Sequence, residues 1–185
     1  MSNSTTDPQN TEQDATGLAS IEELLAEIRA GRPVILVDDE QRENEGDLIL
    51  PAATITTEQV AFTIRYTGGV ICLAMPNALA EHLELPPMVQ HNAAPRRTAY
   101  TVSIEAREGV TTGISAQDRA TTIRTTVKPG VTAADLVRPG HVFPLRARDG
   151  GVLRRAGHTE AAVDICRLAG LPPVGAVSEL MHDDG

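Results

Sequence analysis

Runs of hydrophobic residues along this chain are separated by polar segments, and their spacing predicts helices and strands in mixed order. Short runs rich in Val, Ile and Leu, bounded by turn residues, are typical of buried strands. Such runs predict strands at 33–38, 48–50, 70–74, 99–105, 141–147, 151–153 and 174–180. In places these strands follow one another without a helix between them. The pattern therefore indicates an α+β fold with a mixed sheet covered by helices rather than a strict βαβ repeat.

Polar capping residues in front of apolar stripes mark the predicted helices. The helices are expected at about 21–31, 57–66, 78–83, from 116 onward and at 160–169, with a single helical turn after Thr132. Their expected N-caps are Ser20, Thr56, Asn77, Ser115 and Thr159.

Two segments lack a periodic apolar pattern. Residues 1–17 are polar and are expected to form a disordered tail. Residues 18–185 are then expected to form one domain, because this length suffices to bury one core. Residues 85–97 contain three prolines and form a predicted loop that is longer than most connections, which is typical of loops with a working role.

Composition narrows the classes of function. The net charge is −9, and no cluster of Lys and Arg predicts a nucleic-acid partner. Cys72 and Cys166 are isolated, so no disulfide framework is expected, and Cys72 is predicted to be a small core residue rather than a nucleophile. No apolar run reaches about 18 residues, so we expect no membrane span, no signal peptide and a cytoplasmic location.

The turn between the first two predicted strands, both expected to be buried, carries six carboxylates within ten residues, from Asp38 to Asp47. These groups repel one another in a short turn, and carboxylate oxygens are the ligands that Mg²⁺ prefers. The alternative interpretation is a solvated acidic hairpin tip without a ligand.

A second candidate motif, RRAGHTE, runs directly into the last predicted helix. A helix N-terminus offers unpaired N–H groups and a partial positive charge. With Arg155 beside it, this end of the helix is a candidate phosphate site, although an ordinary capped helix with exposed arginines has the same sequence pattern. His158 lies next to the candidate site, where an imidazole can complete a metal site or carry protons, whereas a structural histidine is the alternative.

Three further positions are candidates for chemistry. His141 begins a predicted strand after Pro139-Gly140, where it can point into a cleft. Glu179 interrupts an apolar strand, where a charge is costly unless it is paired or faces outward. Thr112 lies in a glycine-containing segment in front of a helix, a context suited to anion contacts.

Four stretches together resemble one known family: DDEQRENEGDLI, EGVTTGISAQDRATT, RPGHVFPLRA and GGVLRRAGHTEAAVDICRLAGL. They are similar to the 3,4-dihydroxy-2-butanone 4-phosphate synthases (DHBP synthases) of riboflavin biosynthesis, from about residue 18 to the end. The resemblance implies a three-layer α-β-α sandwich around a mixed twisted sheet, a homodimer, and a lyase that uses Mg²⁺ or Mn²⁺, two ions per site. The implied reaction converts D-ribulose 5-phosphate to L-3,4-dihydroxy-2-butanone 4-phosphate and formate.

The resemblance also implies roles for single residues. Glu43 and His158 correspond to metal ligands, and His141 and Glu179 to the residues essential for catalysis. The implied substrate contacts are Arg42, Glu43, Asp47, Thr112, Arg155, Ala156, Gly157, His158, Thr159 and Glu179. Cys72 matches a further pocket position.

This chain departs from the family pattern in two ways. Ser178 stands where family members usually have Cys, and they usually continue beyond Asp183-Asp184-Gly185, so we expect this chain to be less stable and less reliably dimeric. Two other functions compete with synthesis. A non-catalytic phosphosugar-binding protein would bind the substrate without turnover, and another metal-dependent sugar-phosphate isomerase or aldolase would release no formate. The negative charge disfavours an RNA-linked role.

Overall fold

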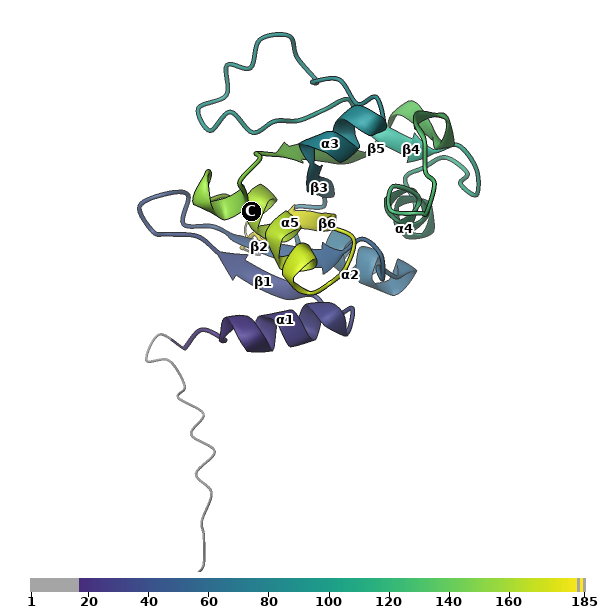
Figure 1. Cartoon of the computed structure of the whole chain (residues 1–185). Helices are drawn as coiled ribbons and strands as arrows, with labels where there is room; N and C mark the ends of the chain where they lie inside the picture. Colours follow the sequence, from purple (N-terminus) through teal and green to yellow (C-terminus); the bar gives the residue numbers. More distant parts are fainter. Residues whose placement is uncertain (1–16, 183, 185) are drawn as a thin grey trace, which may run out of the picture.

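The computed structural model describes residues 17–182 and 184, and the strands among them form one six-stranded sheet (Figure 1). The strands are β1 (Val34–Val37), β2 (Gly46–Pro51), β3 (Cys72–Pro76), β4 (Ile104–Ala106), β5 (Leu136–Ala147) and β6 (Gly175–Glu179). Their order across the sheet is β1-β2-β6-β3-β5-β4. β3 and β5 are parallel and all other neighbours are antiparallel, which confirms the predicted mixed sheet. Apart from Gly17, the predicted tail 1–17 lies outside the described residues.

The helices begin close to the predicted positions. They are α1 (Ile21–Arg29), α2 (Thr57–Tyr66), α3 (Asn77–His82), α4 (Ala116–Thr125) and α5 (His158–Leu168), with 3₁₀ turns η1 (Ala133–Asp135) and η2 (Gly151–Leu153). Ser20 and Thr56 each form the predicted capping box, and the Ser115 hydroxyl accepts a hydrogen bond from the backbone N–H of Asp118. Local capping chemistry therefore set these three helix starts correctly.

Helices cover both faces of the sheet, which confirms the three-layer α-β-α architecture. Successive strand residues point to opposite faces. On one face, Ile49 and Val177 pack with Ala162 of α5, and α1 packs against α5 through Ile28. Figure 1 shows α5 across the middle strands and α1 beside the edge strand β1. The opposite face packs against α2, α3 and α4.

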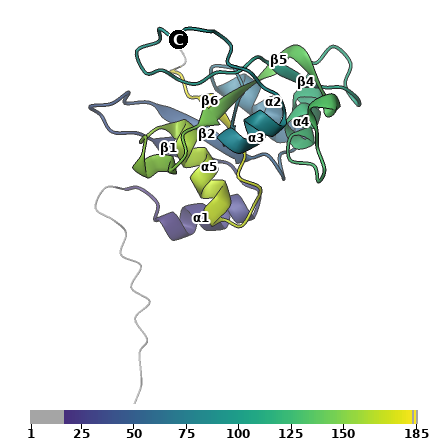
Figure 2. The same ribbon diagram turned by 45° about the horizontal axis from the view of Figure 1, so that its top comes forward.

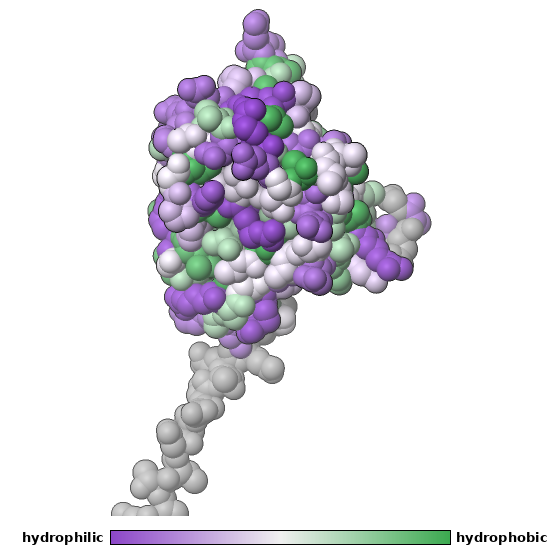
Figure 3. All heavy atoms as spheres, turned by 90° about the vertical axis from the view of Figure 1, so that its right-hand side faces the viewer, coloured by the Kyte–Doolittle hydropathy of each residue, from purple (hydrophilic) through white to green (hydrophobic). Residues whose placement is uncertain are grey.

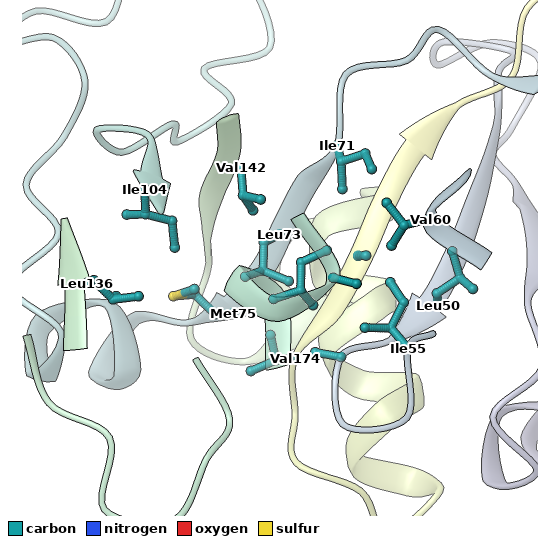
Figure 4. Close-up of a cluster of buried hydrophobic side chains, with 14 of the residues drawn as sticks. Leu50, Ile55, Val60, Ile71, Leu73, Met75, Ile104, Leu136, Val142 and Val174 are labelled. Atoms are coloured by element: carbon teal, nitrogen blue, oxygen red, sulfur yellow. The ribbon is translucent and has the colours of Figure 1, made fainter. Parts of the chain in front are cut away.

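The larger core cluster fills the α2/α4 side of the sheet and is almost entirely aliphatic (Figure 4). Leu50, Leu73 and Ile104 are completely or almost completely buried there, and full burial of such a side chain stabilises the fold by roughly 1.5–3 kcal/mol. The face drawn in Figure 3 shows apolar residues as small areas among polar ones. Of the helices in the described residues, none has the length and apolar character needed to cross a membrane.

The predicted strands differ from the structure where glycines or the sheet edge intervene. Residues 151–153 form η2 rather than a strand, because Gly150 and Gly151 have φ of 95° and 60°, which no strand residue adopts. β1 is an edge strand, and Ile35 and Val37 are more than half exposed, so the prediction that both strands beside the acidic turn are buried was wrong for β1. Only β2 is buried.

Four other predicted element boundaries also differ from the structure. The 99–105 segment forms only isolated bridges at Tyr100 and Thr101 before β4 begins at Ile104. β3 starts at Cys72, and β5 starts before 141. Asn77 is the first residue of α3 rather than its cap, because Pro76 takes the N-cap position and makes no side-chain hydrogen bond.

Candidate active site

The last residues of β6, the acidic turn before β2 and the start of α5 surround one pocket on the α5 side of the sheet. Side chains from six separate parts of the chain meet there. The lining residues are Arg42, Glu43, Glu45, Asp47, Val70, Cys72, Thr98, Tyr100, Leu145, Arg155, His158, Thr159, Val177, Ser178 and Glu179.

The acidic turn, residues 38–46, is organised by its first carboxylate. Asp38 accepts hydrogen bonds from the backbone N–H groups of Glu43, at 3.1 Å, and Glu45, at 2.9 Å. Its other interaction is with the guanidinium of Arg42, at 2.7 Å. Although burial alone would raise the pKa of Asp38, these hydrogen bonds lower it to about 2. The turn therefore holds its shape through internal donors, which sequence reasoning had not foreseen.

Glu43 lies in the middle of this turn with two cationic neighbours. An oxygen of Glu43 lies 2.5 Å from Nη1 of Arg42, and the other lies 3.4 Å from Nε of Arg96. Arg96 comes from the 85–97 loop, the long connection seen beyond the sheet in Figures 1 and 2. The side chain of Glu43 is 23% exposed, so the carboxylate faces the pocket and remains accessible to solutes.

Asp47 and His158 form the floor of the pocket. Nδ1 of His158 lies 3.3 Å from Oδ2 of Asp47, and both side chains are at least 90% buried. Burial raises the pKa of Asp47 to about 7, and the charge of Glu179, opposite it across β2 and β6, contributes to the rise. Burial lowers the pKa of His158 and favours the neutral imidazole, the form that binds metals.

Two buried polar atoms here have no partner among the described residues: Nε2 of His158 and Oδ1 of Asp47. Buried polar atoms without partners are rare in folded proteins, and in a pocket such atoms are suited to bind an ion or a polar group of a ligand. No group of three metal-ligating side chains occurs among the described residues, so protein donors alone would supply only part of a coordination shell. Mg²⁺ usually keeps several waters and binds one or two carboxylates. Glu43 and His158, which line one pocket, are suited to bind an ion that takes its other ligands from water.

The start of α5 differs from the prediction. The N-cap is Gly157 and the helix begins at His158, so Thr159 lies inside the first turn and is buried. The reason is that the backbone of Gly157 takes the extended cap conformation, while a Cβ at this position would overlap the guanidinium of Arg155. No side chain caps this helix start, and His158 and Thr159 of its first turn line the pocket.

Arg155 is held by a partner that the sequence did not predict. Its Nη1 lies 2.7 Å from Oε2 of Glu160, which is 1% exposed, and the backbone N–H of Arg148 donates to the other oxygen of Glu160. The pair fixes the guanidinium at the pocket edge and leaves donor groups of Arg155 free for an anion. Ala156 and Gly157 are adjacent in the chain but do not line the pocket.

The remaining wall residues show what sequence reasoning missed. Tyr100 and Leu145 line the pocket, and the Tyr100 hydroxyl lies 3.5 Å from Sγ of Cys72. Burial raises the pKa of Cys72 to about 11, which supports the prediction that it is not a nucleophile. Ser178 is buried, and its hydroxyl donates to the carbonyl of Val70 at 2.8 Å. One indication of these residues was present in the sequence: the unusual length of the 85–97 loop, which directly precedes the pocket residues Thr98 and Tyr100.

Two further predicted site residues, His141 and Thr112, do not line this pocket. His141 lies on β5 with Nδ1 at 2.5 Å from Oε1 of Glu105, a residue of β4. Thr112 lies next to Gly113, whose missing side chain leaves the space that this glutamate occupies. The structure thus separates most of the predicted residues into a main group at the pocket and a second group, with His141 on β5 and Thr112 in the loop before α4. Glu179 belongs to the main group.

A helix N-terminus with an adjacent arginine, together with a carboxylate and an imidazole, is typical of an enzyme site for a small phosphorylated substrate that works with a metal ion. The pocket in this three-layer fold therefore indicates a metal-dependent enzyme that acts on a small phosphorylated substrate. Comparison with known proteins identifies the family within this class of enzymes.

Residues 22–185 match the family described as 3,4-dihydroxy-2-butanone 4-phosphate synthase. The chain is 59% identical over 170 residues to the riboflavin biosynthesis protein RibBA of Salinispora arenicola, covering 92% of this chain but only 40% of that protein's length. It is 53% identical over 173 residues to 3,4-dihydroxy-2-butanone 4-phosphate synthase of Histophilus somni, covering 94% of this chain and 81% of that protein.

Solved structures agree with these relatives. A crystal structure of 3,4-dihydroxy-2-butanone 4-phosphate synthase in complex with two magnesium ions has a TM-score of 0.88 and 48% identity, covering 90% of this chain and 77% of that one. A cation-free form of such an enzyme has a TM-score of 0.84 and 46% identity, with 89% and 76% coverage. The chain therefore belongs to the 3,4-dihydroxy-2-butanone 4-phosphate synthase family.

Proposed function

We propose that this chain is a lyase that converts D-ribulose 5-phosphate to L-3,4-dihydroxy-2-butanone 4-phosphate and formate. The observation that carries the proposal is that the N-terminus of α5, with Arg155 beside it, meets Glu43 and His158 at one pocket. Family membership agrees with it, although the chain spans only 40% and 42% of the length of two RibBA relatives. The proposal concerns the synthase reaction alone.

The substrate phosphate would bind at the start of α5. The free N–H groups of the first turn, the Thr159 hydroxyl and the unused donors of Arg155 can each donate to phosphate oxygens. These contacts are remote from the carbons that react, so their binding energy can hold the intermediates in place through several steps. Arg42 and Asp47, which line the same pocket, are proposed to contact the sugar hydroxyls.

Glu43 and His158 are proposed to hold Mg²⁺, with Mn²⁺ as a possible replacement and two ions per site. A divalent ion bound there would supply Lewis-acid stabilisation of the charge that develops next to the substrate carbonyl. Asp47 is placed to hold Nδ1 of His158, so that the unpartnered Nε2 is the nitrogen available as a ligand.

Glu179 and His141 are proposed to move protons. Glu179 lines the pocket, and burial together with the charges of Glu45 and Glu43 raises its pKa, which favours a carboxyl group that can give as well as take a proton. His141 does not line the pocket of its own chain. We propose that the protein is a homodimer in which the β4/β5 group of one copy, with His141 and Thr112, completes the pocket of the other.

The direct test is incubation of the purified chain with D-ribulose 5-phosphate and Mg²⁺, followed by measurement of formate. We expect formate release that requires the divalent ion and falls by about 10² or more in Glu43→Gln and Glu179→Gln, with melting temperatures close to that of the unaltered chain. Substrate binding without turnover would instead indicate a phosphosugar-binding protein. Consumption of substrate without formate would indicate an isomerase or aldolase. The single domain at 18–185 and the cytoplasmic location stay predictions.

A further inference from the structure

Glu105 makes a close two-point contact with His141 outside the pocket described above. Oε1 of Glu105 lies 2.5 Å from Nδ1 of the imidazole and 3.2 Å from the backbone nitrogen of the same residue. The side chain of Glu105 is 14% exposed, whereas that of His141 is 43% exposed. One carboxylate oxygen therefore holds both the backbone and the ring of His141, and the ring keeps an accessible face.

The sheet is distorted at the point where these residues meet. Ile104 pairs with Val142, but the next residue of β4, Glu105, pairs with Val137, so the register shifts between the two. A bulge of this kind redirects side chains that a regular ladder would keep apart. Gly140 permits the approach of the two strands, since a Cβ on it would overlap the backbone of Ile104.

A second glycine leaves room for the carboxylate itself. Gly113 has φ of 88°, and a Cβ on it would overlap the carboxylate of Glu105. The loop that carries Gly113 is fixed from behind by Asp118, which accepts the Thr111 hydroxyl at 2.8 Å and the Gly113 N–H at 3.0 Å. Contacts from β4, β5 and the start of α4 thus fix the position of the Glu105 carboxylate.

We propose that Glu105 is a positioning residue that fixes the tautomer and orientation of His141. An ionised carboxylate only accepts hydrogen bonds, so the proton of the neutral imidazole must lie on Nδ1. Nε2 then presents its lone pair at the exposed side of the ring and can take a proton from a substrate, while the nearby carboxylate stabilises the imidazolium that results. The inference rests on the proposed proton-transfer role of His141 and adds a residue to which no role had been given.

The tautomer can be measured without altering Glu105. The chain has five histidines, so uniform ¹⁵N-histidine labelling gives five ring systems, and the spectrum of His141→Asn identifies the His141 signals by their loss. In two-bond ¹H–¹⁵N spectra of the unaltered protein, above the pH at which the ring is protonated, we expect the proton of His141 on Nδ1. In Glu105→Ala we expect the population to move to the Nε2–H form. A merely structural role for Glu105 would not set the tautomer.

Kinetics supply the second readout. Glu105→Gln keeps the shape of the side chain but removes its charge, and we expect kcat to fall by about 10–100-fold while KM stays nearly unchanged. Glu108→Gln is the matched control, because Glu108 is an exposed carboxylate just beyond β4, and it should leave kcat unchanged. The double variant Glu105→Gln with His141→Asn should be no slower than His141→Asn alone, since Glu105 would act only through that ring.

The outcomes separate this inference from the proposed function. If the unaltered chain releases no formate, the proposed function fails and the role of Glu105 fails with it. If the chain is active but His141 carries its proton on Nε2, or if Glu105→Gln retains full kcat, only the inference about Glu105 is overturned. Should Glu105 variants fail to fold, the spectrum of the unaltered protein still decides, because an Nδ1–H ring supports the inference and an Nε2–H ring refutes it.

Discussion

At the scale of single residues, Asp38 shows how an acidic turn is held by donors of its own backbone and by an arginine. Its carboxylate accepts two backbone N–H groups and contacts the guanidinium of Arg42. These donors favour the ionised form, which is why the pKa of Asp38 falls to about 2. The sequence pattern did not reveal these donors, which hold the turn beside the proposed metal ligand Glu43.

We predict that Asp38 stabilises the fold in a pH-dependent manner. Its pKa is about 2 in the folded chain against an ordinary value of 3.8, so the contribution is present above pH 3.8 and is lost as the pH falls from 3.8 to about 2. Thermal melts of the unaltered chain and Asp38→Asn between pH 2 and 7 should differ at neutral pH and converge at the acid end. The exposed Glu40→Gln is the control and should melt like the parent throughout. A difference that persists unchanged at pH 2 would contradict the assignment.

At the scale of elements, the first turn of α5 combines ligand binding with stability. Arg155 faces the pocket, yet its Nη1 also pairs with Glu160, whose side chain is 1% exposed. An arginine expected to act only on the substrate therefore also neutralises a buried charge. The two roles have separable consequences.

We predict that Arg155→Ala destabilises the chain by about 3 kcal/mol, because it leaves the buried charge of Glu160 without its cationic partner. The double variant with Glu160→Gln should recover much of this loss, since the uncompensated charge is gone, but it should not recover substrate affinity. Urea unfolding measures the first effect and KM for the sugar phosphate the second. Arg154→Ala, an exposed neighbour, is the control. Equal stability of Arg155→Ala and the parent would show that the ion pair contributes nothing.

The 85–97 loop touches the acidic turn through Arg96, which lies near Glu43 and also donates to the carbonyl of Arg42. A cation beside a proposed metal ligand opposes metal binding. We predict that Arg96→Ala binds Mg²⁺ up to about fivefold more tightly, the range expected for a half-exposed ion pair. Calorimetric titration with Mg²⁺ alone measures this, and Arg97→Ala on the same loop should leave the affinity unchanged. Weaker Mg²⁺ binding in Arg96→Ala would reverse the interpretation.

At the scale of the whole molecule, the sheet holds two groups of predicted site residues. One group surrounds the pocket at the ends of β2 and β6, and the other, with His141 and Glu105, lies on β4 and β5 at the opposite edge. The homodimer proposed above, in which the pocket of one copy meets the β4/β5 edge of the other, would bring the two groups together.

We predict that two inactive variants restore activity when they are mixed. Glu43→Gln supplies an intact His141, and His141→Asn supplies an intact pocket, so a mixed dimer contains one complete site. After unfolding and refolding together, random pairing should return about a quarter of the parent activity. Mixing Glu43→Gln with Glu179→Gln is the control and should return none, because both changes affect the same pocket. No recovery in the first mixture would place His141 at the pocket of its own chain.

The sequence by itself determined the features that depend on neighbours in the chain. The capping boxes at Ser20 and Thr56 and the buried strand after the acidic turn follow from local patterns. The motifs also identified the family, because long stretches of site residues lie close together in the sequence.

Only the tertiary structure decided features that depend on distant partners. The exposure of β1 follows from its place at the sheet edge, and the η2 turn follows from two glycines with positive φ. The pairings of Arg155 with Glu160 and of Glu105 with His141 depend on where helix and strand ends meet and on a register shift in the sheet. Local sequence preferences do not predict these long-range pairings, because the free energy that stabilises them comes from burying surfaces that lie far apart along the chain.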